Sequence, residues 1–385
     1  NAFHDQGKLD EAIDCFRKSI AVNANRAEAH NSLGTTFTDL GRLDEAMTSY
    51  RNAIAVDQEF ADAHKNMAYA LLMQGKLKAG WKKYTWRLKS KDCQTPLLPI
   101  EMWPGTPLQG KSIIVYAEQG VGDEIMFAGC LGDLLEQSPD NVYLECDPRL
   151  EALFARSFPG VRVHGKTRDI DLSWLGDDLQ PDYSLPIGSL PQFFRNDISQ
   201  FPDRAAYLLP HPELVDKWTE RLALLKEGPK ISISWRGGIG ARGDRKVSPP
   251  LSDWQSLLSM QASFINLQYS DVSQEIAGVC DGSAIQIHDW EDNDPLTDID
   301  SQAALISCLD LVITVGNTTA HGAGALGIPT WVLVEKIPYW QWSEAFGDSP
   351  PLYRSVRLFR QKEFFEWGDV MERLAQSLND LIRNE

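Results

Sequence analysis

The sequence lacks long apolar runs: none reaches the roughly 18 residues of a membrane-spanning helix, and no signal-peptide pattern is visible. It also has little basic charge, since 37 Lys and Arg residues stand against 54 Asp and Glu, for a formal net charge of −17. This balance argues against nucleic acid and anionic membrane surfaces as main partners, although a local basic pocket can still bind phosphate. We therefore expect neither a membrane span nor a nucleic-acid partner.

Cysteine is sparse and shows no pairing pattern. The six cysteines are scattered, and none belongs to a Cys-x-x-Cys pair. This spacing is typical of ordinary thiols in a reducing compartment and offers neither a disulfide framework nor a zinc site. We therefore expect a cytoplasmic protein without a metal site. A hydrophobic share of 43% over 385 residues is enough for two or three packed domains.

A 34-residue repeat fills the start of the chain. The segment GKLDEA at residues 7–12 returns as GRLDEA at 41–46 and, weakened, as GKLKAG at 75–80. This period resembles the tetratricopeptide repeat, a helix pair per unit, and predicts a helical stack over residues 1–90. Its concave face can hold a peptide, or the stack can be a purely structural cap on the domain that follows.

The last repeat does not end in a polar cap. Residues 80–88 (GWKKYTWRL) carry large aromatic side chains, and a proline-rich junction follows. Aromatic side chains of this size are usually covered by apolar surface in a folded protein. We therefore expect Trp81 and Trp86 to dock on the next domain.

Strand and helix patterns alternate over the next part of the chain. The predicted elements, a strand first and then helix and strand in turn, cover residues 111–118, 125–137, 141–146, 148–158 and 161–164. This alternation is typical of a parallel, doubly wound sheet with helices on its faces. We assign it to a domain over residues 91–205, followed by a linker at 206–228.

The turn after the first of these strands is QGVGDE, residues 119–124. Gly120 and Gly122 form a glycine turn that matches half of a dinucleotide fingerprint, but Ile125 replaces the third glycine, so NAD binding is a weak alternative. Asp123 starts the following helix, where a carboxylate is stabilised as the anion and can take a proton from a hydroxyl. Asp123 as a simple N-cap fits the sequence equally well.

A second α/β pattern, over residues 229–361, carries the one basic, glycine-rich loop of this acidic protein. The loop RGGIGARGDRK at 236–246 follows a predicted strand. Glycine lets the backbone approach a ligand, and arginine supplies charge for a diphosphate, which points to Arg236, Arg242 and Arg245. A solvated, flexible loop is the alternative.

The most informative stretch is VGNTTAHGAGALG at 315–327, where a buried strand ends and a short helix of small residues begins. After the predicted cap Asn317, the free N–H groups and the hydroxyls of Thr318 and Thr319 face the carboxyl ends of the strands. That edge is where α/β sheets bind ligands, and the arrangement suits a phosphate. His321 shares the face of Thr318. A cap followed by a helix that needs small residues for packing is the alternative.

Together these segments resemble a tetratricopeptide repeat protein fused to a glycosyltransferase of the heptosyltransferase-like family nine. The motifs that carry the resemblance are GW…Y-x-WR (80–87), AEQGVGD (117–123), WRGG (235–238), LQY (267–269), AHGAGALG (320–327) and RLFRQ (357–361). The resemblance implies the GT-B architecture: two Rossmann-like domains, with the donor nucleotide on the C-terminal one, the acceptor toward the N-terminal one, and no metal.

The resemblance also implies roles for individual residues. Asp123, which follows the glycine turn, corresponds to the general base of the family. The implied nucleotide and diphosphate contacts are Arg236, Arg242, Arg245, Gln268, Asn317, Thr318, Thr319 and His321. One position departs from the family pattern, because the Asp that usually precedes the last helix and touches the donor sugar is Gly316 here. This departure speaks against a heptose donor and weakens the case for activity.

We therefore expect a metal-independent, inverting glycosyltransferase that uses a nucleotide-diphosphate sugar and no further cofactor. Its repeats, together with the loop rich in His and Thr, are also similar to protein O-GlcNAc transferases, which makes a protein or peptide acceptor conceivable. The alternative is a catalytically degenerate protein that binds a nucleotide or a protein partner. At the end of the chain, we expect residues 338–351 to line the cleft and a helix at 362–385 to cross back onto the N-terminal Rossmann-like domain.

Overall fold

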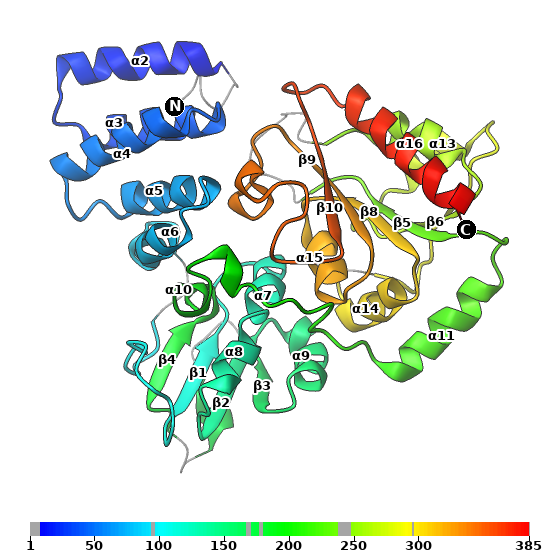
Figure 1. Ribbon diagram of the computed structural model, residues 1–385, viewed down its shortest axis with the longest axis horizontal. Coiled ribbons are helices and arrows are strands. Elements are labelled where there is room, and N and C mark those ends of the chain that lie inside the picture. Colours follow the sequence, from blue (N-terminus) through cyan, green and yellow to red (C-terminus); the bar gives the residue numbers. More distant parts are fainter. Residues whose placement is uncertain are drawn as a thin grey trace.

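The computed structural model describes residues 8–93, 97–166, 171–176, 180–237, 248–294 and 296–384. Figure 1 shows a stack of helices at the N-terminus, a smaller sheet below it and a larger sheet beside both. Both sheets are parallel, with helices between successive strands. The predicted fold class, helical repeats followed by two Rossmann-like domains, is confirmed.

The helical stack follows the 34-residue period of the sequence. Its elements are α2 (Leu9–Val22), α3 (Ala27–Asp39), α4 (Leu43–Val56), α5 (Ala61–Met73), α6 (Leu77–Tyr84) and the 3-10 turn η1 (Thr85–Lys89). Small residues let neighbouring helices pack closely, since a Cβ on Gly34 of α3 would lie 2.5 Å from the ring of Tyr50 on α4. Ile13, Phe37 and Met47 complete the buried core of the stack.

The smaller sheet has the strand order β3-β2-β1-β4. Its part of the chain contains β1 (Ser112–Tyr116), α7 (Val121–Ala128), α8 (Leu131–Glu136), β2 (Asn141–Cys146), η2 (Pro148–Leu150), α9 (Glu151–Ser157), β3 (Val161–Gly165), η3 (Ser173–Leu175), β4 (Tyr183–Pro186), η4 (Ile187–Ser189), α10 (Pro191–Phe194) and η5 (Ile198–Gln200). The helix expected at 125–137 is two helices, α7 and α8. Because β1 lies between β2 and β4, the strand order reverses beside β1, and α7 begins at its carboxyl end.

The larger sheet has the order β10-β9-β8-β5-β6-β7. Its part of the chain contains β5 (Lys230–Ser234), η6 (Leu251–Trp254), α12 (Gln255–Leu258), β6 (Ser263–Asn266), α13 (Ser273–Cys280), β7 (Ile287–His288), α14 (Ile299–Ser307), β8 (Leu311–Val315), α15 (Thr318–Ala325), β9 (Thr330–Val334), η7 (Trp340–Trp342), η8 (Glu344–Phe346) and β10 (Val356–Arg360). The order reverses between β5 and β8, and α15 starts at the carboxyl end of β8.

The segment expected to be a linker, residues 206–228, contains the helix α11 (Pro212–Ala223). Trp218 on this helix is fully buried, and its indole N–H donates to the hydroxyl of Ser301 on α14 at 3.1 Å. Part of the segment is therefore a packed helix of the larger domain.

The prediction that the last helix crosses back to the smaller domain is wrong. Helix α16 (Gly368–Asn384) packs on α12, η6 and β10, all of which belong to the larger domain. Its buried residues Val370, Leu374 and Leu378 join an apolar cluster drawn entirely from that domain. The apolar spacing correctly indicates an amphipathic helix, but it carries no information about which domain covers the apolar face.

The repeats are joined to the rest of the molecule by a shared core. Trp81 is buried, its indole N–H donates to the backbone carbonyl of Arg195 at 2.8 Å, and its ring meets that of Trp340 edge to face. One apolar cluster contains Trp81, residues of α7 and residues of α15. The expected docking of Trp81 is therefore confirmed. The same expectation for Trp86 is wrong, because its ring stacks on His64 within the helical stack.

A buried ion pair strengthens the same junction. Arg87 of η1 is paired with Glu118, which follows β1, and both side chains are almost inaccessible to solvent. Arg87 also donates to the hydroxyl of Ser189 and to the carbonyl of Tyr84, and Glu118 accepts from the backbone N–H of Gly188 after β4. The carboxylate therefore bridges the ends of β1 and β4 while the guanidinium holds the repeats against them.

Candidate functional site

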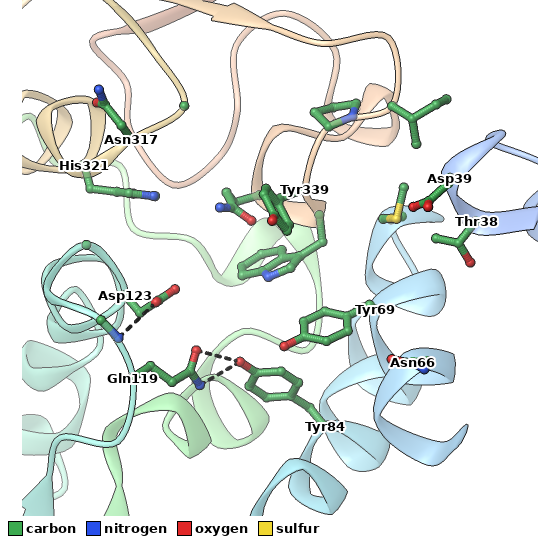
Figure 2. A pocket seen from close by; sticks show the side chains of 18 of the residues that line it. Thr38, Asp39, Asn66, Tyr69, Tyr84, Gln119, Asp123, Asn317, His321 and Tyr339 are labelled. Atoms are coloured by element: carbon green, nitrogen blue, oxygen red, sulfur yellow. Dashed lines mark hydrogen bonds between the residues drawn. The ribbon is translucent and has the colours of Figure 1, made fainter. Parts of the chain in front are cut away.

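A cavity of ≈ 510 Å³ lies where the three parts of the molecule meet. One wall is the helical stack, here called the repeat wall: Thr35, Thr38, Asp39, Tyr50, Asn66, Tyr69 and Met73. The smaller domain contributes the turn before α7, and the larger domain contributes the start of α15 and residues 337–341. Figure 2 shows Asp123, His321, Tyr339 and Tyr69 around the same space, each from a different element.

Asp123 lies in the first turn of α7 and lines the cavity. Gly120, not Asp123, is the N-cap of α7, so the expectation of Asp123 as the N-cap residue is wrong; Asp123 occupies the third helical position, and its carboxylate accepts a hydrogen bond from the backbone N–H of Gly120 at 3.3 Å. Burial raises the pKa of Asp123 to about 6 despite this hydrogen bond, and the neighbouring Glu118 adds to the rise. A carboxylate with a pKa close to neutral is a stronger base than an ordinary aspartate and is still mostly ionised at pH 7.

Gly122 is required where α7 approaches α15. A Cβ at this position would lie 3.2 Å from the hydroxyl oxygen of Thr318 and 3.4 Å from Cδ2 of His321. The glycine therefore lets two helix N-termini, one from each sheet, converge on one cavity. Each N-terminus presents free N–H groups and partial positive charge, a combination that favours an anion.

Helix α15 is capped by Asn317, as the sequence predicts. The side-chain oxygen of Asn317 accepts a hydrogen bond from the backbone N–H of Ala320 at 3.2 Å. Its amide group donates to the hydroxyl of Ser234 at 2.8 Å and to the carbonyl of Arg236 at 3.2 Å. The side chain thus joins the carboxyl ends of β5 and β8, and it holds the start of α15 at the point where the strand order reverses.

The next residues of α15 divide between the cavity and the core. Thr318 and His321 line the cavity, whereas Thr319 is 5% exposed and does not belong to the lining. Successive residues of a helix point about 100° apart, which explains the difference between Thr318 and Thr319. His321 is also 5% exposed, and burial lowers its pKa to about 4, so the imidazole is neutral at physiological pH.

Trp342 fills the space that a side chain at position 316 would need. A Cβ on Gly316 would lie 2.8 Å from Nε1 of Trp342. The Trp342 ring is 1% exposed and stacks on the imidazole of His321, with ring centroids 5.2 Å apart. The expectation that residues 338–351 line the cleft is confirmed for Pro338–Gln341, and Trp342 lies directly behind them.

Besides Thr319, two more of the expected phosphate contacts, Gln268 and Arg236, lie outside the cavity lining. Gln268 is 2% exposed, and its side-chain oxygen accepts from the hydroxyl of Ser234 and from the backbone N–H of Arg236, so it braces the end of β5. The guanidinium of Arg236 is paired with Glu275. Arg242 and Arg245 lie outside the residues that the structure describes. Glu145, which lies at the end of β2 where NAD binding would need an acid for the ribose hydroxyls, is buried and accepts a hydrogen bond from the indole N–H of Trp174 at 3.3 Å, away from the cavity.

The repeat wall is the part of the site that the sequence analysis missed. Tyr84, at the end of α6, accepts from the side-chain amide of Gln119 at 2.8 Å, and its hydroxyl lies 3.2 Å from the amide oxygen. The Asn66 amide donates to Asn31 and Thr35, which aligns polar groups along α3 and α5. The 34-residue period places Thr35 and Asn66 on equivalent helices, α3 and α5, and this signal was available in the sequence.

Within the described residues there is no group of three or more His, Cys, Asp and Glu side chains that is placed to hold a metal ion. The same part of the chain contains no helix that is both long and apolar enough to cross a membrane. None of the six cysteines, all of which lie in the described part of the chain, forms a disulfide.

Comparison with known proteins agrees with this architecture. A family model described as TPR repeat matches residues 1–37 and 34–75, so the N-terminal segment carries tetratricopeptide repeats. Protein FlbA of Caulobacter vibrioides is 33% identical over 329 residues, which cover 81% of this chain and 54% of the relative. The chain therefore spans about half the length of that relative.

The α/β part is similar to solved glycosyltransferase structures. ADP-heptose LPS heptosyltransferase II of E. coli is 14% identical with a TM-score of 0.51, and the match covers 71% of this chain and 99% of that one. This likeness shows the fold: two Rossmann-like domains arranged as in a heptosyltransferase. A mutant O-GlcNAc transferase of Thermobaculum terrenum matches over 100% of this chain and 91% of its own, with 14% identity and a TM-score of 0.32.

Proposed function

We propose that this chain forms the active centre of a glycosyltransferase that moves a sugar from a nucleotide diphosphate to a hydroxyl group, without a metal and with inversion at the anomeric carbon. One observation carries the proposal: Asp123 of the smaller domain shares a cavity with Thr318 and His321 of the larger domain. A base on one side and an anion-binding helix end on the other are what the attack of a hydroxyl on a diphosphate donor requires.

In the proposed reaction Asp123 takes the proton of the attacking hydroxyl. The oxygen forms a bond to the anomeric carbon while the bond from that carbon to the diphosphate breaks, and the electron pair leaves with the diphosphate. Because this is a single displacement, the configuration inverts. The raised pKa of Asp123, about 6, suits the step, since the group is mostly ionised at pH 7 and binds a proton more readily than a solvated aspartate.

Charge on the departing diphosphate would be stabilised by the start of α15. Its free backbone N–H groups and the Thr318 hydroxyl face the cavity, and the N-terminus of α7 points into the same space. Two helix N-termini supply positive potential of the kind that a metal ion supplies in other transferases. Arg236 opens the basic loop beside this position, and in the proposal that loop adds further positive charge.

The acceptor that fits the cavity best is a polypeptide hydroxyl, presented along the repeat wall. Thr38, Asp39 and Asn66 give this wall hydrogen-bonding groups, and Tyr69 gives it an aromatic face. Side chains of this kind can bind an extended backbone without strict dependence on sequence. The repeats share a core with both α/β domains, so the wall is held at a fixed place beside Asp123.

A donor screen tests the proposal. The chain is mixed with UDP, GDP and ADP and with their sugar conjugates, and thermal unfolding is followed. A ligand at a hundredfold its dissociation constant adds about 2.7 kcal/mol to the free energy of unfolding. The conjugate that stabilises the protein is then incubated with candidate acceptor proteins, and nucleoside diphosphate release and the mass of the acceptor are measured. Asp123→Asn should still bind the nucleotide but should not transfer sugar.

A binding module without activity is the second candidate, and one observation favours it. Trp342 occupies the place of the acidic side chain that family nine transferases usually carry before α15. If the protein only binds, nucleotides or peptides will stabilise it, no sugar will be transferred from any donor in the screen, and Asp123→Asn will behave like the wild type in every binding assay.

A further inference from the structure

Gln119 lines the cavity and is held there by a residue of the repeats. The hydroxyl oxygen of Tyr84 lies 2.8 Å from Nε2 of Gln119 and 3.2 Å from its Oε1. Figure 2 shows Gln119 close to Asp123, with its amide directed toward Tyr84. His321, across the cavity, is held within its own domain, since its Nδ1 lies 2.9 Å from the hydroxyl oxygen of Tyr353. Gln119 therefore links the turn that carries Asp123 to the repeats.

The main chain at Gln119 is fixed by its neighbours. The preceding residue, Glu118, is paired with Arg87 and accepts from the backbone N–H of Gly188 at 3.1 Å. A Cβ on Gly188 would lie 2.6 Å from Oε1 of Glu118 and 3.0 Å from Nε2 of Gln119, so this close approach requires glycine. Because both its main chain and its amide are held, Gln119 loses little conformational freedom when a ligand binds to it.

The contact with Tyr84 leaves part of the Gln119 amide for a ligand. A glutamine amide has two N–H donors and an oxygen with two lone pairs. One hydroxyl group can accept from one N–H and donate its single proton to one lone pair, and this count is the same for either orientation of the amide. Among the described residues only Tyr84 is hydrogen-bonded to the amide. At least one N–H and one lone pair of Gln119 therefore remain for a ligand in the cavity.

We infer that Gln119 binds the main chain of the acceptor polypeptide at the residue that receives the sugar, and that Tyr84 is a positioning residue that holds the Gln119 amide. A residue of an extended chain presents its N–H and its C=O along the same edge, and one lone pair with one N–H is the complement of that pair. A polypeptide that follows the repeat wall passes Gln119 as it brings its hydroxyl to Asp123. The inference rests on the proposed function and narrows its acceptor to a polypeptide, since a glycan lacks this edge.

NMR of the side-chain amides tests this contact without catalysis. The chain is labelled with ¹⁵N, and Gln119→Met identifies the NH₂ signals of Gln119. The probe is a library of short peptides with threonine at the centre, either unmodified or with a methyl group on the backbone nitrogen of that threonine. We expect the unmodified library to shift the Gln119 signals and the methylated library to shift them less. Equal shifts with both libraries, or no shift with either, would overturn the inference.

Kinetics provide a second test, with a peptide that spans the modified residue of an acceptor found in the donor screen. Gln119→Met keeps the length of the side chain and removes its hydrogen-bonding groups. We expect kcat/KM for the peptide to fall about tenfold to thirtyfold, the effect of two neutral hydrogen bonds. Hydrolysis of the donor by water and KM for the donor should stay within about twofold of wild type, because neither needs the main-chain contact.

Methylation of the peptide backbone makes this test specific. In the wild type, a methyl group on the nitrogen of the acceptor residue should lower kcat/KM about fivefold, because it removes one hydrogen bond. In Gln119→Met the methyl group should have little further effect. The same fivefold loss in both proteins would show that Gln119 does not contact the main chain at that residue.

Tyr84→Phe tests the positioning role. It keeps the ring and releases the Gln119 amide, so we expect kcat/KM for the peptide to fall about threefold, and to fall no further when the change is made in Gln119→Met. A loss that persists in the double variant would assign Tyr84 a role apart from Gln119. Gln137→Met is the control: Gln137 is exposed at the end of α8, outside the cavity lining, and its loss should change none of these measurements. If no polypeptide is glycosylated, the proposed function fails, and the NMR shifts still decide whether Gln119 binds a peptide backbone.

Discussion

Gly122 lies so close to Thr318 that a Cβ on the glycine would come within 3.2 Å of the threonine hydroxyl oxygen. The two residues belong to different Rossmann-like domains, and their contact brings the starts of α7 and α15 together. The position of Asp123 relative to the start of α15 therefore depends on the absence of one side chain.

Gly122→Ala should separate the two helix starts by a few tenths of an ångström. Overpacking of this kind typically costs about 1 to 3 kcal/mol, and here part of the cost can be relieved by moving the domains apart. We expect a modest fall in the free energy of unfolding, measured by urea denaturation, and a larger fall in turnover than in nucleotide affinity. Wild-type turnover in this variant would show that the contact does not set the geometry of the site.

Helix α15 offers a matched pair of glycine substitutions. A Cβ on Gly324 would collide with the Tyr353 ring, whereas a Cβ on Gly322 meets no atom within 4 Å. Gly324→Ala should therefore destabilise the protein by about 1 to 3 kcal/mol and displace Tyr353 from His321. Gly322→Ala should be neutral or stabilising by up to about 1 kcal/mol, because alanine is the better helix former. Equal effects of the two substitutions on the denaturation midpoint would contradict the packing described for Tyr353.

The junction between the repeats and the α/β domains can be tested at Arg87. Arg87→Met keeps much of the side-chain volume but leaves Glu118 buried without its cationic partner. Removing one member of a buried ion pair typically costs about 3 to 5 kcal/mol. We expect that loss in the free energy of unfolding, together with a single unfolding transition if the repeats and the α/β domains share one core. A separate early transition of the repeats in the wild-type protein would contradict the shared core.

The sequence predicted secondary structure well where an element is determined by residues that are neighbours along the chain. The strand predicted at 141–146 agrees with β2 to the residue, because its apolar residues between polar breaks are typical of a buried parallel strand. The 34-residue period likewise predicted the helical stack, because each repeat is a helix pair formed by neighbouring residues. The start of α15 was predicted because Asn317 and the small residues after it act within one turn of chain.

What the sequence did not reveal depends on contacts between distant segments. The apolar face of α16 fits either domain, and only the packed structure decides that it covers the larger one. Thr38, Asp39 and Asn66 reach the cavity only because Trp81 and Arg87 dock the repeats beside α7. Gln268 has a polar side chain of the kind that often contacts ligands, but this side chain is hydrogen-bonded to Ser234 and Arg236.

Asp123 should affect activity and stability in opposite directions. Its folded-state pKa, about 6, lies above the ordinary value of 3.8, so the folded protein holds this proton over a pH range in which the unfolded chain has lost it. Proton binding by Asp123 therefore contributes to the free energy of unfolding below about pH 4, and this contribution is lost as the pH rises through 6. Above that pH the protein carries a buried carboxylate whose charge costs stability.

Asp123→Asn removes both the charge and the base. At pH 7 we expect the variant to be more stable than wild type by about 1 to 2 kcal/mol, after a discount for solvent screening of this half-buried group. At pH 4 the difference should vanish. Turnover by the wild type should rise with pH with an apparent pKa of about 6, and the variant should lose about 10²- to 10⁴-fold of it. Chemical denaturation at the two pH values and a pH–rate profile measure these effects. A variant that is less stable than wild type at pH 7 yet keeps full turnover would reduce Asp123 to a structural role at the start of α7.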